Sequence, residues 1–460
     1  MPGARADGRA SIADAVARGA CAVLWEQEGI ALAPKITVPN VAVSHLQEYS
    51  GEIAHLVYGR PSDKLWMVGV TGTNGKTSVS QWIAQALTLA GKPCAVIGTL
   101  GNGIPGKLQD SPNTTPDAVT VQRLLAGFLA ADAAACAMEV SSIGLDQGRV
   151  AAVAFDIAVF TNLTRDHLDY HGSMEDYGRA KKKLFAMPGI EAVVINLDDP
   201  FGVTLSRELA GKVHRIGYTL ARASDMAEQA DEIVAAEDLV VGGSGLVFNI
   251  RTQAGVARIE APLLGRFNAA NLLAVLGTLL ASGSDLERAA KVLAVLTSPP
   301  GRMQAADPGR DEPLVVIDYA HSPDALGQAL ATLAEISRAR GGQIICLFGC
   351  GGERDRGKRP LMGKVAALLA DRVLLTNDNP RGENPQTIID DILSGMAEPV
   401  PVEPDRAAAI QRVVMDAAAN DVVLVAGKGH EAYQEIAGRR LPFSDLEQAR
   451  AALVAWRAAA

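Results

Sequence analysis

The chain has 460 residues, and at about 150 residues per domain this length predicts roughly three domains. Hydrophobic residues make up 48% of the chain and charged residues 21%, which excludes disordered and collagen-like proteins and fits a compact enzyme. The net charge of −9 argues against a sequence-independent nucleic-acid binder, because such a protein needs a clustered basic surface.

The cysteines and the longest apolar run bear on the compartment of the protein. The five cysteines are scattered, odd in number and mostly set in apolar runs, and no signal peptide opens the chain. We therefore expect reduced thiols and a cytoplasmic protein. The longest uncharged run, residues 267–284, contains Asn268 and Asn271, which favours a buried helix over a membrane span.

Three blocks of the chain differ in pattern, and we expect one domain in each: residues 1–63, 64–298 and 299–460. The first block is thin, with a helix-like stretch at 11–17 and a short apolar strand at 22–24. In the second block, strands without polar alternation are separated by helices, which predicts a parallel sheet covered on both faces. These strands are at residues 65–70, 95–97, 135–138, 157–160 and 193–195.

A linker at residues 297–301 separates the second block from the third, because two prolines and a glycine stop any preceding helix. Beyond it, further apolar strands alternate with helical patterns and predict a second α/β series. These strands are at residues 314–317, 344–348, 373–375 and 422–425.

A glycine-rich turn between a strand and a helix is the strongest chemical motif of the chain. Its glycines let backbone N–H groups surround phosphates, and the N-terminus of the following helix adds positive potential. Lys76 would reach the outer phosphates, and the Thr77 hydroxyl would be a Mg²⁺ ligand. Val70 stands where this motif usually has its first glycine, but the Gly-Lys-Thr placement still predicts ATP or GTP binding. The run reads Thr71-Gly72-Thr73-Asn74-Gly75-Lys76-Thr77-Ser78.

Besides the glycine-rich turn, the second block contains two candidate metal ligands and a run of lysines. Glu139 ends a hydrophobic strand, where a carboxylate of an open α/β sheet faces the ligand crevice and can hold Mg²⁺. His167 is either a metal ligand or a loop histidine with ordinary hydrogen bonds, and the residue alone favours the second interpretation. Lys181 belongs to three consecutive lysines on a helix predicted to begin at Ser173, and such a run is usually a solvated face.

Polar loops follow the four predicted strands of the third block. Because the carboxyl ends of parallel strands meet at one edge of a sheet, these loops are expected to share a ligand. Their alternating acids and arginines suit a zwitterion, with an arginine such as Arg354 binding a carboxylate. The loops contain Asp318, Arg354, Asp378-Asn379-Pro380-Arg381, Gly427 and Glu431.

Taken in order, these motifs resemble the Mur ligase family of peptidoglycan synthesis over nearly the whole chain. The resemblance implies an α/β fold of three domains: one for a uridine nucleotide, a central P-loop-type ATPase domain with a parallel sheet, and a C-terminal Rossmann-like domain for an amino acid. Besides the phosphate loop, the matching motifs are Asn113-Thr114-Thr115, Glu139-Val140-Ser141-Ser142, Asp166-His167-Leu168-Asp169-Tyr170-His171, Pro300-Gly301-Arg302 and Asp378-Asn379-Pro380-Arg381.

The resemblance also implies an activity. Members of this type use ATP to phosphorylate the D-glutamyl carboxylate of UDP-N-acetylmuramoyl-L-alanyl-D-glutamate, and the amine of meso-2,6-diaminopimelate then displaces phosphate to form an amide. We therefore expect ATP as co-substrate, Mg²⁺ as cofactor and only small molecules as partners. No nucleic acid and no membrane insertion are expected, and the chain is expected to be a monomer.

Residue by residue, the resemblance implies five sets of site residues. The catalytic set is Lys76, Glu139, His167 and Lys181, and the metal ligands are Thr77, Glu139, His167 and Lys181, which stands where the family carbamylates a lysine. The ATP set is Gly72, Thr73, Asn74, Gly75, Lys76, Thr77, Ser78, Asn271, Arg302 and Asp318. The muramoyl-dipeptide set is Asn113, Thr114, Thr115, Ser141, Gln147 and Arg149. The diaminopimelate set is Arg354, Asp378, Asn379, Pro380, Arg381, Gly427 and Glu431.

Four other functions are weighed against this one. Arg381 can clamp the second carboxylate of diaminopimelate, which lysine lacks, so it counts against a lysine-adding relative. Residues 166–171 count against a folylpolyglutamate synthase. A nucleotide-switch ATPase would release phosphate without an amine acceptor, and an NAD-binding oxidoreductase would need a G-x-G-x-x-G turn that the third block lacks.

The start of the chain departs from the family pattern. Residues 3–9 resemble a loop that lies some way into a typical member, and the segment before it usually supplies contacts to uracil. We expect a start codon placed too late, which leaves the ATPase and amino-acid assignments unchanged.

Overall fold

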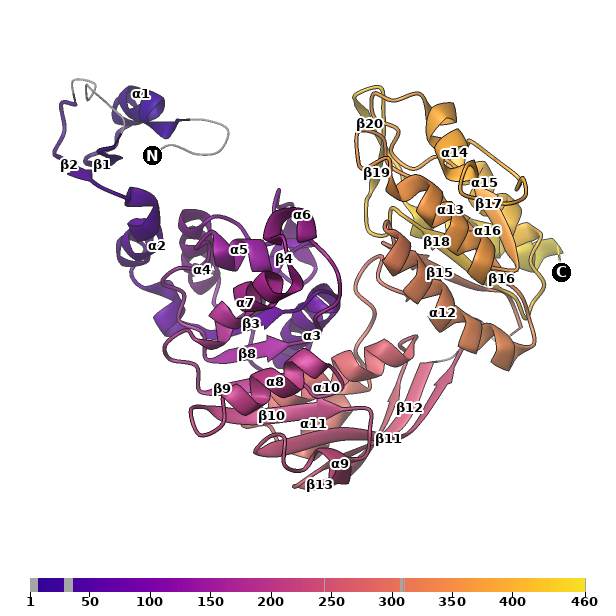
Figure 1. Ribbon diagram of the computed structural model, residues 1–460, viewed down its shortest axis with the longest axis horizontal. Coiled ribbons are helices and arrows are strands. Elements are labelled where there is room, and N and C mark those ends of the chain that lie inside the picture. The colour runs from indigo at the N-terminus through magenta and orange to yellow at the C-terminus, as the bar shows by residue number, and fades with distance from the viewer. Residues whose placement is uncertain (1–6, 29–35, 244, 307–308, 310, 460) are drawn as a thin grey trace. The chain divides into compact units, whose positions relative to one another are not determined.

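The computed structural model describes residues 7–28, 36–243, 245–306, 309 and 311–459 (Figure 1). Residues 3–6 of the loop discussed above lie outside the described residues. The chain forms two compact units: Met1–Lys76 with Gly91–Val193, and Thr77–Ala90 with Val194–Ala460. The three-domain boundaries expected from the sequence stay a prediction.

The first unit begins with short elements whose largest helix is anchored by one acid. The Glu26 carboxylate accepts hydrogen bonds from the N–H groups of His45 (3.2 Å) and Leu46 (2.8 Å), where α2 begins. A carboxylate at this helix end satisfies unpaired N–H groups and favours the positive end of the helix dipole. The elements are η1 (Gly8–Ser11), α1 (Ile12–Ala17), β1 (Val23–Glu26), its parallel partner β2 (Asn40–Val43), α2 (Leu46–Val57) and η2 (Pro61–Lys64).

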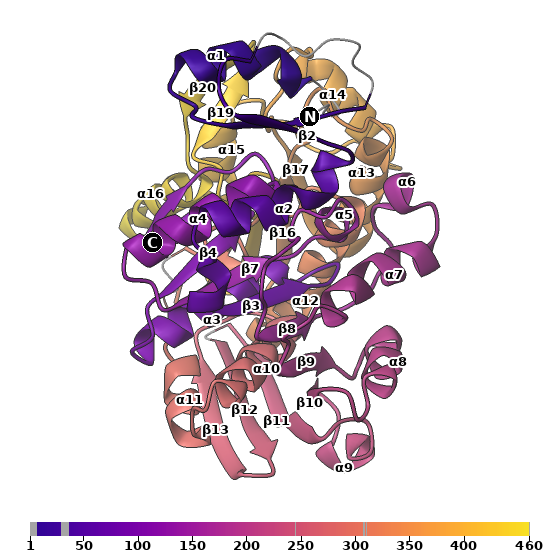
Figure 2. The same cartoon turned by 90° about the vertical axis from the view of Figure 1, so that its left-hand side faces the viewer.

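A parallel sheet forms the centre of the first unit, as predicted (Figure 2). β3 (Trp66–Thr71) lies between β7 (Ala135–Glu139) and β8 (Ile157–Phe160), and all three run parallel. β7 also pairs in parallel with β4 (Cys94–Gly98), and the residues of these inner strands are almost all buried. The helices of this unit are α4 (Ala118–Ala130), α5 (Ser142–Asp146), α6 (Leu168–His171) and α7 (Met174–Phe185).

An antiparallel edge, which the sequence did not predict, extends this sheet. β4 pairs with β5 (Gly101–Ile104), and β5 pairs with β6 (Lys107–Gln109). Neither short strand contains an apolar run: β5 is rich in glycine, and β6 is largely exposed. Their strand character comes from pairing rather than from residue preference.

The second unit contains a further sheet region and its helices, with β9 (Ala192–Asn196) at the boundary between the units. β10 (His214–Thr219) pairs in parallel with β11 (Glu232–Gly242), and β11, β12 (Gly245–Thr252) and β13 (Gly255–Ala261) form an antiparallel meander that was not predicted. Exposed and buried residues alternate in β13, so it has one exposed face. The helices are α3 (Lys76–Leu89), α8 (Pro200–Glu208), α9 (Ala223–Met226), α10 (Arg266–Ala281) and α11 (Leu286–Leu293).

α10 accounts for the long uncharged run. It is buried along most of its length, which confirms the predicted core helix. No helix among the described residues is long and apolar enough to cross a membrane.

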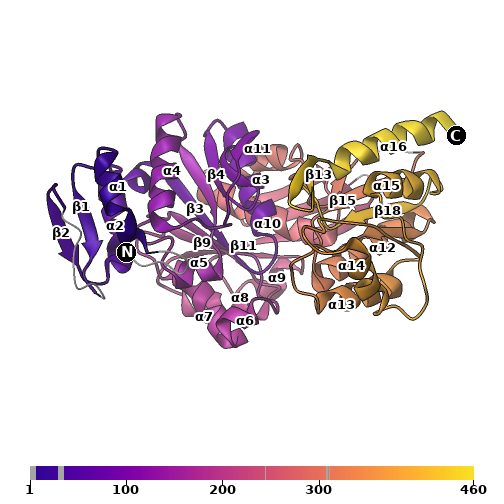
Figure 3. The same ribbon diagram turned by 90° about the horizontal axis from the view of Figure 1, so that it is seen from above.

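The C-terminal part of the second unit is a five-stranded sheet with helices on both faces (Figure 3). Its strand order is β14-β15-β18-β16-β17, and every pair is parallel except β14 with β15. One face packs against α12 (Pro323–Arg340), α13 (Lys358–Leu369) and α14 (Pro385–Leu393), and the other against α15 (Arg406–Met415) and α16 (Asp445–Ala459). The strands are β14 (Gln304–Ala305), β15 (Leu314–Asp318), β16 (Ile344–Phe348), β17 (Arg372–Leu375) and β18 (Val422–Ala426), and a hairpin of β19 (Tyr433–Ile436) and β20 (Arg439–Pro442) follows. The predicted strands are confirmed.

Candidate functional site

The glycine-rich turn follows β3 and leads into α3, as the sequence predicted. Gly72 has φ +152°, and a Cβ there would lie 1.8 Å from Thr161 Oγ1. Gly75 has φ +87°. Only glycine fits at both positions, because the first leaves no space for a side chain and the second is strained for any other residue. Thr77 and Ser78 begin α3 and are buried.

Backbone and side-chain groups of the loop after β8, together with Tyr177 of α7, hold this turn in place. Asn162 O accepts from the Thr73 N–H (2.8 Å), and Asn162 Oδ1 accepts from the Asn74 N–H (2.8 Å). Thr161 Oγ1 donates to Asn74 O (2.6 Å), and the Thr73 hydroxyl is 3.1 Å from the Tyr177 hydroxyl. The backbone of the turn is therefore fixed by the protein itself.

Two lysines converge on the carbonyl of Gly72. Lys76 Nζ donates to Gly72 O (2.9 Å) and Thr73 O (2.8 Å), and Lys181 Nζ donates to Gly72 O (2.8 Å). Lys181 is only 1% exposed, so the solvated-face interpretation is wrong for this residue. Burial, together with the nearby charge of Lys76, lowers the pKa of Lys181 well below its usual value and favours the neutral amine.

Glu139 is fully buried at the end of β7. Its Oε1 accepts from the Thr99 N–H (2.8 Å) and its Oε2 from the Thr99 hydroxyl (3.1 Å). Gly98 leaves space for the carboxylate, since a Cβ there would lie 2.2 Å from Oε1. The sequence reasoning missed Thr99, although it follows β4 at the same edge of the sheet.

Four of the residues predicted to hold the muramoyl dipeptide are linked by hydrogen bonds, namely Thr115, Ser141, Gln147 and Arg149. The Thr114 hydroxyl is 3.1 Å from the Thr99 hydroxyl, and Thr115 Oγ1 is 3.0 Å from Ser141 Oγ. Arg149 Nη1 donates to Thr115 O (2.9 Å). Arg149 Nη2 also donates to Gln147 Oε1 (2.7 Å), whereas Asn113 O accepts from Ser111 Oγ (2.8 Å), which is not one of the predicted substrate residues.

The His167 ring lies edge-on to the ring of Tyr177, with centroids 6.3 Å apart, and the Tyr177 hydroxyl contacts Thr73 of the glycine-rich turn. The backbone of His167 is left-handed, with φ 51°, its side chain is 48% exposed, and Nε2 lies 3.5 Å from Asp166 Oδ2. Among the described residues, no three His, Cys, Asp or Glu side chains are grouped so that they could hold a metal ion.

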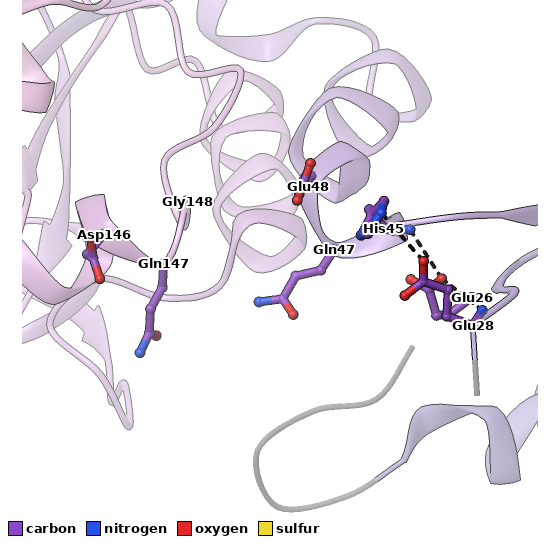
Figure 4. A pocket seen from close by; sticks show the side chains of 8 residues that line it. All are labelled: Glu26, Glu28, His45, Gln47, Glu48, Asp146, Gln147 and Gly148. Atoms are coloured by element: carbon purple, nitrogen blue, oxygen red, sulfur yellow. Dashed lines mark hydrogen bonds and ion pairs between the residues drawn. The ribbon is translucent and has the colours of Figure 1, made fainter.

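A cavity of about 460 Å³ in the first unit borders the predicted substrate residue Gln147 (Figure 4). Acidic side chains dominate its lining, so a neutral hydrogen-bonding group fits it better than a phosphate does. It is lined by Glu26, Glu28, His45, Gln47, Glu48, Asp146, Gln147 and Gly148.

In the second unit, Asp318 and Arg302 lie where the linker passes the end of β15. Asp318 Oδ2 accepts from the Met303 N–H (2.8 Å), and burial raises the pKa of Asp318 although the Arg302 charge opposes this. The Arg302 guanidinium lies over the ring of Tyr319 (5.1 Å). Asn271 is buried in α10, where its Nδ2 donates to Asn268 Oδ1 (3.1 Å).

The loops after β17 and β18 meet, as predicted for the edge of a parallel sheet. Asn379 Nδ2 donates to Glu431 Oε2 (2.7 Å), and both residues contact Lys428, which the sequence reasoning did not assign. Asp378 is buried, and a Cβ on Gly427 would lie 2.5 Å from its Oδ2. Gly427 is therefore required by close approach as well as by its φ of +113°.

Arg381 is held by the β19–β20 hairpin. Its N–H donates to Glu435 O (3.0 Å), its carbonyl accepts from the Ala437 N–H (2.8 Å), and its Nη1 donates to Gly352 O (2.8 Å). The backbone is left-handed with φ 51°, so the hairpin keeps Arg381 in a conformation that a free loop would avoid. The sequence reasoning did not assign this hairpin to the site.

The remaining residues of the predicted pocket differ in how firmly they are fixed. Pro380 is buried, and its carbonyl accepts from the Glu383 N–H (3.0 Å). Arg359, which the sequence reasoning missed, is fully buried and donates to Glu383 and to Gly351 O (3.2 Å). Arg354 is exposed.

Comparisons with known proteins match two protein families to successive regions of the chain. Residues 70–279 match the Mur ligase middle domain, and residues 301–429 match the Mur ligase glutamate ligase domain. The chain is 52% identical to UDP-N-acetylmuramoyl-L-alanyl-D-glutamate--2,6-diaminopimelate ligase of Pseudomonas aeruginosa, over 99% of this chain and 92% of that protein. The chain belongs to the Mur ligase family.

Other Mur ligases are similarly close. The ligase of the same name from Chromobacterium violaceum is 53% identical over 99% of this chain and 90% of its own length. A solved structure of a UDP-N-acetylmuramoyl-L-alanyl-D-glutamate--2,6-diaminopimelate ligase has a TM-score of 0.69 and 38% identity, covering 98% of this chain and 90% of that chain. The predicted fold class, the three-domain α/β architecture of a Mur ligase, is confirmed. As a Mur ligase, the chain uses ATP.

Proposed function

We propose that this chain is the ATP-dependent ligase that joins meso-2,6-diaminopimelate to UDP-N-acetylmuramoyl-L-alanyl-D-glutamate in peptidoglycan synthesis. The observation that carries the proposal is the 52% identity to the Pseudomonas aeruginosa ligase of that name over 99% of the chain. Arg381 at the end of an Asp-Asn-Pro-Arg run agrees with it, because an arginine there suits an acceptor with a second carboxylate.

In the first step, an oxygen of the D-glutamyl carboxylate attacks the γ-phosphorus of ATP, and ADP leaves. Residues 72–78 would cradle the phosphates, and Lys76 would exchange the carbonyls of Gly72 and Thr73 for phosphate oxygens. Its charge would stabilise the charge that moves toward the acyl oxygen. Asn271, Arg302 and Asp318 would bind the nucleoside part and the outer phosphates of ATP.

The residues of this region fit Mg²⁺. The Thr77 hydroxyl and the Glu139 carboxylate supply the oxygen ligands that this ion prefers, and His167 would complete the set. A neutral buried amine, the form that the Lys181 site favours, is the form that adds CO₂ to give a carbamate, which would supply one more carboxylate. Bound Mg²⁺ would neutralise phosphate charge during transfer.

The second step takes place at the acyl carbon. The unprotonated amine of diaminopimelate attacks it, the tetrahedral intermediate expels phosphate, and the amide nitrogen loses a proton. Arg381 would bind the distal carboxylate, and Glu431 would bind the distal ammonium group. Asn113, Thr114, Thr115, Ser141, Gln147 and Arg149 would hold the muramoyl dipeptide, and Arg354, Asp378, Asn379, Pro380 and Gly427 would complete the amino-acid pocket.

The proposal includes the expectations on organisation that follow from the resemblance. Residues 1–63 would bind the uridine nucleotide, residues 64–298 would be the ATPase domain, and residues 299–460 would bind the amino acid. The protein would act as a cytoplasmic monomer.

The test is phosphate release from ATP with UDP-N-acetylmuramoyl-L-alanyl-D-glutamate and three acceptor conditions: diaminopimelate, L-lysine and no amine. We expect sustained release with diaminopimelate only. Equal or greater release with L-lysine would establish the lysine-adding alternative, and release without an amine would establish a simple ATPase.

A further inference from the structure

Lys428 is a buried lysine placed between two side chains of the proposed diaminopimelate pocket. Its side chain is 0% exposed. Its Nζ donates to Asn379 Oδ1 (3.0 Å) and to Glu431 Oε2 (3.1 Å). An ammonium group removed from water to this degree requires such partners, and here both partners belong to the pocket.

The contacts of Asn379 show what Lys428 does to the amide. Oδ1 accepts from Lys428 Nζ and from the Glu435 N–H (2.9 Å), and Nδ2 donates to Glu431 Oε2 (2.7 Å). Since Lys428 and the Glu435 N–H can only donate, the amide oxygen must face them and the amide nitrogen must face Glu431. Lys428 and the Glu435 N–H together therefore set which end of the Asn379 amide points at the acid.

The contacts of Glu431 show a matching effect on the carboxylate. Lys428 and Asn379 both donate to the same oxygen, Oε2, so the carboxylate is fixed through one of its two oxygens. The Glu431 side chain is 18% exposed, and an ionised acid at this depth is costly without a nearby positive charge. Lys428 places a positive charge 3.1 Å from the carboxylate oxygen of Glu431.

We propose that Lys428 is a positioning residue that selects acceptors carrying a distal ammonium group. It does so by holding the Asn379 amide and the Glu431 carboxylate as a fixed pair, while Arg381 binds the distal carboxylate. This inference rests on the proposed function of the pocket.

A role in folding alone would look different, and the same domain offers an example. Arg406 and Asp445 form a fully buried ion pair, with Nε–Oδ1 at 2.7 Å, and Arg406 also donates to Ala426 O (3.0 Å). Those contacts join α15, α16 and the end of β18. Both hydrogen-bond partners of Lys428, in contrast, are predicted ligand-binding residues, and its Nζ also lies 5.5 Å from the ring centroid of Tyr433.

The experiment compares two acceptors in one variant, Lys428→Met, which keeps the length of the side chain and removes its charge. The acceptors are diaminopimelate and 2-aminopimelate, which has both carboxylates and the attacking amine but no distal ammonium. The ratio of their kcat/KM values is internal to each protein, so partial loss of folded protein cancels. We expect the preference for diaminopimelate to fall by about tenfold or more, with the KM for ATP changed by less than about threefold.

Two further variants complete the test. Lys428→Gln removes the charge but keeps a donor, and it replaces Lys428→Met in the comparison if that variant does not fold. Arg457→Met is the control, because Arg457 pairs with the buried Glu312 (2.8 Å), outside the loops of the pocket; it should lower the melting temperature and leave the acceptor ratio unchanged.

The outcomes separate this inference from the proposed function. An unchanged acceptor ratio in a folded, active Lys428 variant would overturn the inference alone, since a purely structural lysine affects both acceptors equally. No diaminopimelate-dependent phosphate release by the unaltered protein would contradict the proposed function and, with it, the inference.

Discussion

The phosphate loop and the amino-acid pocket are two predicted sites of one chain that are built in different ways. The loop is a run of consecutive residues in which glycine conformation and backbone groups carry the geometry, with Gly72 and Gly75 as its two required glycines. The pocket is assembled from loops after separate strands, and its geometry depends on side-chain pairs such as Lys428–Glu431 and Arg359–Glu383. A site of the first kind can be recognised from local sequence, and a site of the second kind requires the fold.

The largest expected effect is at the loop, where Lys76→Ala should nearly abolish ATP turnover. Lost charge stabilisation of about 3 kcal/mol corresponds to more than a hundredfold in rate. Lys212→Ala, at an exposed lysine of the second unit, is the control and should leave turnover unchanged. Phosphate release at saturating substrates is the measurement. Near-normal turnover in Lys76→Ala would remove the phosphate-loop assignment.

A second prediction tests whether backbone geometry is what makes the loop. Gly72→Ala places a Cβ 1.8 Å from Thr161 Oγ1, so it should displace the loop and reduce ATP turnover by about tenfold or more. Gly91→Ala is the matched control: φ is +88° there, but no atom lies within 4 Å of the added Cβ. It should cost only about 1–2 kcal/mol of folding free energy, with turnover unchanged. Calorimetry measures the loss of stability in both variants, and phosphate release measures their ATP turnover. Equal ATP turnover in Gly72→Ala and Gly91→Ala would contradict this account of the loop.

A third prediction addresses the pocket through Arg381. Arg381→Ala should raise the KM for diaminopimelate by roughly thirtyfold and change the KM for ATP little, because a charge-assisted carboxylate contact is lost. Arg381→Lys should restore the affinity for diaminopimelate only in part, since lysine cannot reproduce the planar, two-pronged guanidinium group of arginine. Arg412→Ala, at an exposed arginine of α15, is the control. Equal increases in both KM values would refute the pocket assignment.

The smallest expected effect concerns the ion pair beside the pocket. In this ion pair, the hydrogen bond from Arg359 lowers the pKa of Glu383 from 4.5 to about 2. Because the folded-state pKa is depressed, this carboxylate contributes stability that is present above pH 4.5 and is lost as the pH falls toward 2. Glu383→Gln should therefore lower the melting temperature at neutral pH, and the difference from the unaltered protein should shrink across that window. If the difference in melting temperature stays constant down to pH 2, the ionised Glu383 carboxylate is not what stabilises the unaltered protein.

The two sites also differ in how much of them could be predicted. The parallel strands of both α/β regions, the turn at Gly72 and the common edge of the C-terminal loops follow from apolar runs and glycine placement. The β11–β13 meander was missed. Residues of β13 alternate in exposure, which gives a weaker signal than a continuous apolar run, although β11 does contain a buried apolar run at residues 233–236.

Partners that are distant in sequence could not be predicted. Thr99 and Glu139 stand 40 residues apart, and Lys428 and Asn379 stand 49 apart, so only the fold brings each pair together. The burial of Lys181 is a similar case, since it depends on the packing of α7 near β3 and not on the neighbouring lysines.

The most direct test of the account follows oxygen atoms through the reaction. UDP-N-acetylmuramoyl-L-alanyl-D-glutamate labelled with ¹⁸O in the reacting carboxylate is incubated with ATP, Mg²⁺ and diaminopimelate, and the released phosphate is examined by mass spectrometry. Activation through an acyl phosphate predicts one labelled oxygen in each phosphate released and one retained in the amide product. Phosphate without label, released at the rate of amide formation, would contradict carboxylate activation by ATP and the account built on it.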